Sequence, residues 1–231
     1  MKETMFDRYA KFISENPSFR GYRRFCNICG YRFSRFDTHG VVTRECKCPV
    51  CLSMERQRML YIQLLALYPR LQDKRILHFA PEKCFREFFA GHPNYFDCDI
   101  DPKKATHQVD ITNISFEDNF FDYIVCVHVL EHIEDDMRAM GELLRVLAPG
   151  GTAFLSVPLY PALYEDYSIT DPAEREKHFG QKDHVRKYNL ETFCSRLEQT
   201  GFTIRLDKAE NYPPHLREEM LLGGTFVLGG K

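Results

Sequence analysis

Apolar residues in the middle of the chain follow two different periods. Residues 120–127 form a nearly unbroken apolar run, which predicts a central parallel strand covered on both faces by helices. The next apolar residues recur at helical spacing and predict a helix. They are Met137, Met140, Leu143, Leu144 and Leu147. We expect Pro149-Gly150-Gly151 to end this helix, because proline interrupts it and glycine accepts positive φ. Residues 152–157 predict the next strand.

An earlier apolar segment ends in carboxylates. Residues 95–101 predict a short strand, and an acid at its carboxyl end can accept hydrogen bonds from both hydroxyls of a ribose. We assign this role to Asp99, with Asp101 as the alternative. The order of strands and helices therefore predicts an α/β sheet that holds an adenosine-type cofactor at the carboxyl ends of its strands.

The segments FDYIVCVHVLEHI and LLRVLAPGG resemble the class I S-adenosylmethionine-dependent methyltransferase family, in particular its type 11-like members. The resemblance covers residues 74–206. It implies a Rossmann-like parallel sheet with one antiparallel strand near residues 225–228. It also implies that the cofactor is S-adenosylmethionine. Apart from the loop after the first strand, the residues that the resemblance implies as its ligands are Asp99 at the ribose with the adjacent Ile100, Asp110 and Ile111 at the adenine, and His128 at a strand end.

The loop after the first strand departs from the family pattern. Family members usually carry glycines there, which let the backbone approach the cofactor. In the stretch LHFAPE of this chain, His78 replaces the usual acid, Ala80 the first glycine and Glu82 the second. Ala80 is small, and Glu82 could meet the methionine ammonium group. We predict a remodelled cofactor loop formed by His78, Phe79, Ala80 and Glu82, and the alternative is a loop that has lost the cofactor.

Four cysteines form two Cys-x-x-Cys pairs with 18 residues between them. Two residues between thiolates let a tight turn aim both sulfurs at one ion, and two such pairs complete a tetrahedron. The pattern predicts a structural Zn²⁺ ribbon whose ligands are Cys26, Cys29, Cys48 and Cys51. Cys46 is left out because its spacing to Cys48 does not repeat the first pair. The alternative is four buried thiols without metal.

Composition and charge limit the possible binding partners and the cellular location. The chain has 231 residues and net charge −2, yet residues 20–58 hold nine basic against three acidic residues, interleaved with aromatics. Such a surface could stack on nucleic acid, although we favour aromatics that form a small core. No apolar run reaches the roughly 20 residues of a membrane span, and Met1-Lys2-Glu3 does not begin a signal peptide. We expect a cytoplasmic protein, and the oligomeric state stays open.

The chain divides into residues 1–53, a helix and the ribbon, and residues 54–231, the methyltransferase domain. Residues 158–188 are a long polar and aromatic stretch, which predicts a substrate lid. If the acceptor is a hydroxyl, it needs a base, and we choose His184, whose pKa normally lies near neutrality, with Asp183 to orient it. Glu165 is the rival base.

His128 and His132 stand four residues apart, a spacing that can bind metal. Because Glu131-His132 matches the family's ordinary start of a helix, we do not predict a metal there.

The predicted function is methyl transfer from S-adenosylmethionine to a small-molecule, sugar or glycan acceptor, at oxygen or nitrogen. One alternative is an rRNA or tRNA methyltransferase that grips RNA through the ribbon, although the net negative charge argues against it. The other alternative is a scaffold protein without catalysis, which the altered LHFAPE loop would explain.

Overall fold

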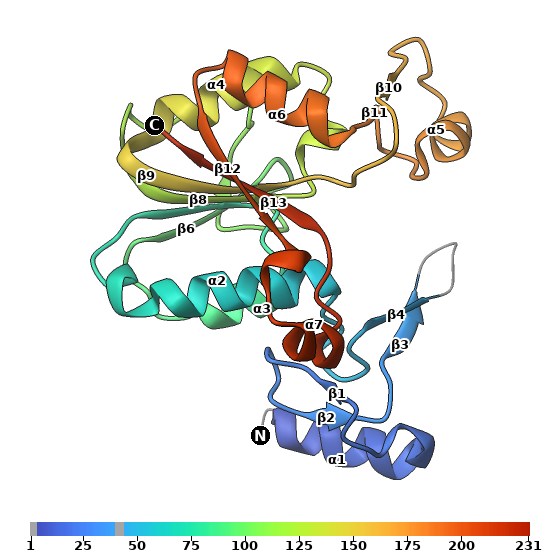
Figure 1. Ribbon diagram of the computed structural model, residues 1–231. Coiled ribbons are helices and arrows are strands. Elements are labelled where there is room, and N and C mark those ends of the chain that lie inside the picture. The colour runs from blue at the N-terminus through green and yellow to red at the C-terminus, as the bar shows by residue number, and fades with distance from the viewer. Residues whose placement is uncertain (1–3, 40–43) are drawn as a thin grey trace. The chain divides into compact units, whose positions relative to one another are not determined.

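The computed structural model describes residues 4–39 and 44–231. The chain forms two compact units, one of Met1–Pro69 with Lys208–Thr225 and one of Arg70–Asp207 with Phe226–Lys231 (Figure 1). This division differs from the predicted boundary after residue 53, because most of helix α2 (Glu55–Leu71) and residues 208–225 pack with the cysteine-rich part. The domains of residues 1–53 and 54–231 stay a prediction.

The second unit contains a seven-stranded, mostly parallel sheet. In spatial order its strands are β12 (Thr203–Lys208), β13 (Thr225–Gly230), β9 (Leu147–Ser156), β8 (Phe121–Val127), β5 (Ile76–Phe79), β6 (Tyr95–Asp99) and β7 (His107–Gln108). Strands β9, β8, β5, β6 and β7 pair in parallel, whereas β13 is antiparallel to β9. The predicted Rossmann-like sheet with one antiparallel strand is confirmed. Strand β8 lies at the centre, as its apolar run predicts.

The prediction for Pro149-Gly150-Gly151 is wrong in one respect. Helix α4 (Asp136–Val146) already ends at Val146, and the three residues lie inside strand β9, where the pairing with β8 shifts register. Gly150 has a φ of 77°, and a Cβ on Gly151 would approach the carbonyl oxygen of Asp122 to 2.8 Å. Glycine is therefore required here for a bulge in the sheet and not for a helix cap.

Helices α4 and α6 (Leu190–Gln199) cover one face of the sheet, and α3 (Lys83–Phe88) lies on the other (Figure 1). Asp135 caps α4 by accepting from the backbone N–H of Arg138, and Asn189 caps α6 by accepting from that of Thr192. The apolar face of α4 enters the core through Met140 and Leu143, both fully buried.

The first unit is a small fold around the cysteines. Besides α2, its elements are α1 (Met5–Glu15), η1 (Pro17–Phe19), β1 (Arg24–Phe25), β2 (Arg32–Phe33), β3 (Asp37–His39), β4 (Arg44–Lys47), η3 (Ala209–Asn211) and α7 (Pro214–Met220). Phe33 and Phe36 are fully buried beside Cys26 and Cys48. The aromatics therefore form a small core, as favoured over a stacking surface; of Tyr22, Phe25, Tyr31, Phe33 and Phe36, which interleave with the basic residues, only Tyr22 is largely exposed.

Two arginines of this basic stretch bind protein groups. The guanidinium of Arg58 is buried and donates to the carbonyls of Ser53 at 2.7 Å and Cys46 at 2.8 Å. Arg24 donates to the carboxylate of Glu45 at 2.7 Å. These two guanidinium groups bind backbone and side-chain groups within the unit, so they are not available to bind phosphate.

Residues 158–188 contain short elements of their own, as expected for a segment of this length. They are β10 (Tyr164–Glu165), α5 (Pro172–Phe179) and β11 (Arg186–Lys187), and β10 pairs with β11 in antiparallel fashion. Asp171 caps α5 by accepting from the backbone N–H groups of Ala173 and Glu174, and Pro172 takes the first helical position. No described helix, within residues 4–39 and 44–231, is long and apolar enough to cross a membrane. The cytoplasmic location stays a prediction.

Candidate active site

A cavity of about 480 Å³ lies at the carboxyl ends of β5, β6 and β8. This edge of a parallel sheet is where α/β folds bind ligands. Its walls are formed by Phe79, Ala80, Asp99, Ile100, Lys104, Val109, Asp110, Ile111, His128, Val129, His132, Ile133 and Asp183. The structure thus brings together seven of the nine predicted cofactor residues, all except His78 and Glu82.

Three acidic residues line the cavity wall: Asp99, Asp110 and Asp183. Asp99 ends β6, and its Oδ1 accepts from the backbone N–H of Asp101 at 2.9 Å. Asp101 does not line the cavity, and its own Oδ1 accepts from the backbone N–H of Lys103 at 3.0 Å. Asp110 follows β7 and closes a turn by accepting from the backbone N–H of Thr112 at 2.8 Å. The geometry therefore favours Asp99 over Asp101 as the ribose ligand.

Two residues on the cavity wall have positive φ although neither is glycine. Ala80 has a φ of 47° and His128 a φ of 56°. Their backbones are held in place, because the N–H of Ala80 donates to the carbonyl of Cys98 and that of His128 to the carbonyl of Ser156, both at 2.8 Å. Such strain at strand ends is typical of functional sites. Ala80 thus adopts the conformation that the glycine of the family pattern would adopt freely.

We expect Ala80→Gly to raise the free energy of unfolding by about 0.5 to 1 kcal/mol. The substitution relieves the positive-φ strain, and this gain exceeds the entropy that glycine adds to the unfolded chain. Urea denaturation of both proteins measures the difference. Ala139→Gly, in the middle of α4, is the matched control and should lower the free energy by a similar amount. A destabilised Ala80→Gly variant would contradict the strain argument.

Two residues of the predicted cofactor loop, His78 and Glu82, lie outside the cavity wall. His78 is fully buried; its Nδ1 is 2.8 Å from the hydroxyl of Tyr95, and its Nε2 is 3.2 Å from Oε2 of Glu82. Neither side chain lines the cavity. His78 therefore supports the loop through Glu82, and a direct role for either residue at the cofactor stays a prediction.

The three predicted acid–base residues lie at three different places. Asp183 lines the cavity, and its Oδ2 is 3.4 Å from Nδ1 of His132. His184 is buried behind it, and burial, with His132 nearby, lowers the pKa of His184 to about 4. Sequence reasoning missed His132 as a cavity residue, although its spacing from His128 could have revealed it.

Glu165, the predicted rival base, does not line the cavity. Its carboxylate accepts two hydrogen bonds from Arg196, at 2.8 and 2.7 Å, and is 3.0 Å from Nε of Arg186. The Arg196 guanidinium, followed by Arg186, holds the pKa of Glu165 below its usual range although burial opposes this. A carboxylate in two ion pairs is a weak proton acceptor, so Glu165 positions the lid instead.

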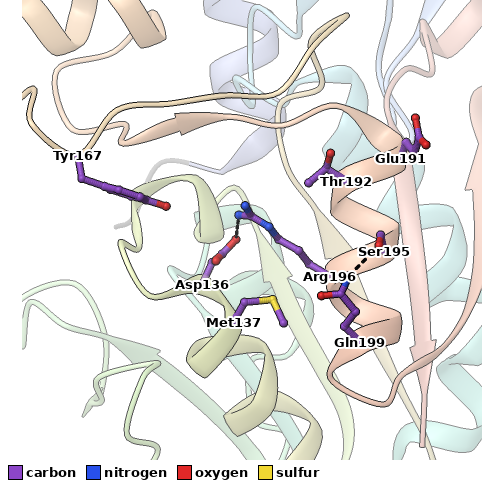
Figure 2. Close-up of a pocket in the computed structure, with 8 residues that line it drawn as sticks. All are labelled: Asp136, Met137, Tyr167, Glu191, Thr192, Ser195, Arg196 and Gln199. Atoms are coloured by element: carbon purple, nitrogen blue, oxygen red, sulfur yellow. Dashed lines mark hydrogen bonds and ion pairs between the residues drawn. The ribbon is translucent and has the colours of Figure 1, made fainter.

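This ion-pair cluster joins the lid to both helices of one sheet face. Asp136 at the start of α4 contacts Arg186, Tyr188 and Arg196. A cavity of about 530 Å³ opens beside it, and Figure 2 shows Asp136 and Arg196 directed toward each other across its wall. The two charges that face each other across it, Asp136 and Arg196, bind each other. We therefore assign it to the packing of the lid.

We expect Arg186→Met to lower the free energy of unfolding by about 3 kcal/mol or more. Arg186 is fully buried and contacts Asp136, Glu165 and the hydroxyls of Tyr167 and Tyr188. Its loss leaves buried carboxylates with less compensating charge. Thermal and urea unfolding measure the effect.

The matched control for Arg186→Met is Lys182→Met, which removes a lid cation that is 68% exposed. This change should cost less than about 0.5 kcal/mol. Equal stabilities of the two variants would show that the cluster does not hold the lid.

The four predicted zinc ligands converge in the first unit. One Sγ atom from each lies within 4.8 Å of the others, and two of the pairs, Cys26 with Cys51 and Cys29 with Cys48, are 3.5 and 3.7 Å apart. Tetrahedral zinc with Zn–S distances of about 2.3 Å separates its sulfurs by about 3.8 Å. The four thiols therefore fit one Zn²⁺ ion. Cys46 lies outside the cluster, as predicted.

Comparisons with known proteins agree with this architecture. A family model described as a methyltransferase domain matches residues 23–206. The ubiquinone/menaquinone biosynthesis C-methyltransferase UbiE of Francisella philomiragia is 31% identical over 106 residues, which cover 38% of this chain and 42% of that protein. The sterol 24-C-methyltransferase erg6 of Schizosaccharomyces pombe is 32% identical over 112 residues, 46% of this chain and 28% of that protein. The chain thus spans less than half the length of these relatives.

Solved structures share the fold at low sequence identity. A SAM-dependent methyltransferase from Archaeoglobus fulgidus has a TM-score of 0.52 and 12% identity, covering 76% of this chain and 94% of that one. A phosphoethanolamine N-methyltransferase 2 from Haemonchus contortus, in complex with S-adenosyl-L-methionine, has a TM-score of 0.51 and 15% identity. The second match covers 74% of this chain and 52% of that one. At these identities the similarity concerns the fold alone.

Proposed function

Because this chain belongs to the class I S-adenosylmethionine-dependent methyltransferase family, we propose that it transfers a methyl group from S-adenosylmethionine to a small-molecule, sugar or glycan acceptor, at oxygen or nitrogen. The observation that carries this proposal is the cavity at the carboxyl ends of β5, β6 and β8. Its wall holds Asp99, Asp110 and Ile111, which the family resemblance assigns to the cofactor.

The donor groups of the cavity fit the proposed cofactor. Asp99 supplies a carboxylate for ribose hydroxyls, and Ile111 and Val109 supply a buried apolar wall for an adenine ring. The backbone of Ala80, turned by its positive φ, leaves room for a close approach. When bound, S-adenosylmethionine supplies a methyl group on a sulfonium, which is ready for displacement.

The other requirements of methyl transfer are met by residues of this chain. Methyl transfer is an in-line displacement, so the protein must align the acceptor and exclude water. Asp183 and His132 stand where the lid meets the cavity and are the polar groups that could hold an acceptor hydroxyl or amine. His184 lies directly behind His132. We propose that Asp183 acts on the acceptor's proton, and that His184, which is buried and does not line the cavity, supports His132 at this position.

The first unit supports this function structurally. We propose that Cys26, Cys29, Cys48 and Cys51 bind one Zn²⁺ ion that holds the unit together. Phe33 and Phe36 are buried and Arg24 is held in an ion pair, so these three residues do not form a surface for RNA, whereas Arg20, Arg23, Arg35 and Arg44 are exposed. The named relatives are, by their names, a C-methyltransferase of ubiquinone/menaquinone biosynthesis and a sterol 24-C-methyltransferase, which supports a small acceptor for this chain but not the choice of oxygen or nitrogen over carbon.

Transfer of tritium from methyl-labelled S-adenosylmethionine tests the acceptor class. The protein is incubated with three fractions of a cell extract: small molecules and short glycans, RNA, and protein. We expect label in the first fraction, and an Asp99→Ala protein serves as the inactive control. Label in RNA would overturn the proposed acceptor, and no label in any fraction would favour a scaffold.

A further inference from the structure

A second group of metal-ligating side chains lies beside the cavity. Helix η2 (Leu130–His132) brings Glu131 and His132 next to His184 of the lid. One potential ligand atom from each of the three residues lies within 4.8 Å of the other two. The rings of His132 and His184 meet edge to face, with centroids 4.7 Å apart and planes at 85°. Sequence spacing alone did not reveal this group, because His184 comes from a distant segment.

One ring nitrogen of His184 is available to a metal ion. Its side chain is buried, and its Nδ1 has no hydrogen-bond partner among the residues that the structure describes. Its ring packs edge to face against that of His132, one of the other two potential ligands. Metal-bound histidines keep one ring nitrogen unprotonated for the ion. A buried nitrogen without a partner costs free energy, which a bound metal would recover.

The backbone on both sides of His184 is fixed to η2. The N–H of Val185 donates to the carbonyl oxygen of Glu131 at 3.0 Å. On the other side, Nδ1 of His132 is 3.2 Å from the carbonyl oxygen of Asp183. These two contacts hold the His184 ring over Glu131 and His132, so the three side chains are prearranged.

The charge and position of the group also suit a cation. Glu131 is 1% exposed, and its Oε1 is 3.4 Å from Nδ1 of His128, so imidazoles surround a buried carboxylate. A buried carboxylate is stabilised by a nearby positive charge. His128 and His132 both line the cavity, so an ion bound here would face it.

We propose that Glu131, His132 and His184 bind a divalent first-row transition metal ion at the wall of the cavity. Two imidazoles and one carboxylate are a donor set that takes Zn²⁺, Mn²⁺ or Fe²⁺ and leaves coordination positions open. An oxygen of the acceptor could occupy an open position, and this part of the inference rests on the proposed function. The metal site itself does not depend on methyl transfer.

Metal titration of the protein with its cysteine site already zinc-loaded tests the proposal. Mn²⁺ is the main probe, because it prefers nitrogen and oxygen ligands and leaves thiolate sites alone. The electron paramagnetic resonance signal of free Mn²⁺ reports binding, and Zn²⁺ is titrated in parallel by calorimetry. We expect one saturable site per chain in addition to the cysteine-bound zinc.

Variants locate the site. His184→Ala and His132→Ala should each weaken metal binding at least about tenfold, since each removes a ligand. His184→Ala leaves a small void in a buried position, so the more exposed His132 provides the second variant. His178→Ala, an exposed lid histidine outside the group, is the control and should bind as the wild type does. Absence of a second site for both metals, or wild-type metal affinity in both His184→Ala and His132→Ala, would overturn the proposal. Neither result bears on S-adenosylmethionine binding, which is measured separately.

Discussion

Asp99→Ala should weaken the binding of S-adenosylmethionine by more than about tenfold, because it leaves two ribose hydroxyls without their acceptor. Asp99 ends β6 and forms part of the cavity wall. The dissociation constant is measured by isothermal titration calorimetry with the zinc-loaded protein.

Asp101→Ala is the matched control for this prediction. It removes a carboxylate two residues away that accepts from the backbone of Lys103 and lies outside the cavity wall. Its affinity should stay within about twofold of the wild type, well below the loss that an unpaired hydrogen-bonding group causes. If Asp101→Ala lost affinity and Asp99→Ala did not, the ribose site would move to Asp101.

Cys48→Ser should remove one zinc atom per chain and lower the free energy of unfolding by about 4 kcal/mol or more. Cys48 is fully buried within the four-thiol cluster, so its loss opens the tetrahedron and also disturbs the small core around Phe33 and Phe36. Elemental analysis gives the zinc content, and urea denaturation gives the stability.

Cys46→Ser is the control for the zinc prediction. Cys46 is also buried and lies two residues away, but its Sγ faces the carbonyl of His39 and is not part of the cluster. The variant should retain its zinc. Zinc loss from Cys46→Ser, or an unchanged zinc content in Cys48→Ser, would show that the ligand set is wrong.

The sheet could be predicted from sequence because its signals are local. The apolar run of residues 120–127 requires cover on both faces, and the acid after residues 95–98 marks a strand end. Both features depend on a few neighbouring residues. The cysteine pairs were predictable for the same reason, since their spacing is itself the geometric condition for one ion.

The conformation of Pro149-Gly150-Gly151 could not be predicted from the neighbouring residues alone. Positive φ at Gly150 follows from its residue type, but the bulge depends on the close approach of β8, which meets Gly151 at the carbonyl of Asp122. The same residues would suit a helix end. Only the pairing of the two strands decides between the two outcomes.

The lid could not be predicted beyond its existence. Glu165 looked like an available carboxylate, but Arg186 and Arg196 reach it from 21 and 31 residues further along the chain. His184 meets His132 from 52 residues away. Such contacts arise from the way the lid packs against α4 and η2, and no spacing in the sequence encodes them.

The central claim is that the cavity with its variant loop binds S-adenosylmethionine. Calorimetric titration of the zinc-loaded wild-type protein with S-adenosylmethionine, and separately with S-adenosylhomocysteine, tests it most directly. We expect one site per chain with a dissociation constant in the micromolar range, about −8 kcal/mol. A folded protein that binds neither ligand would contradict the account and identify the chain as a methyltransferase fold without its cofactor.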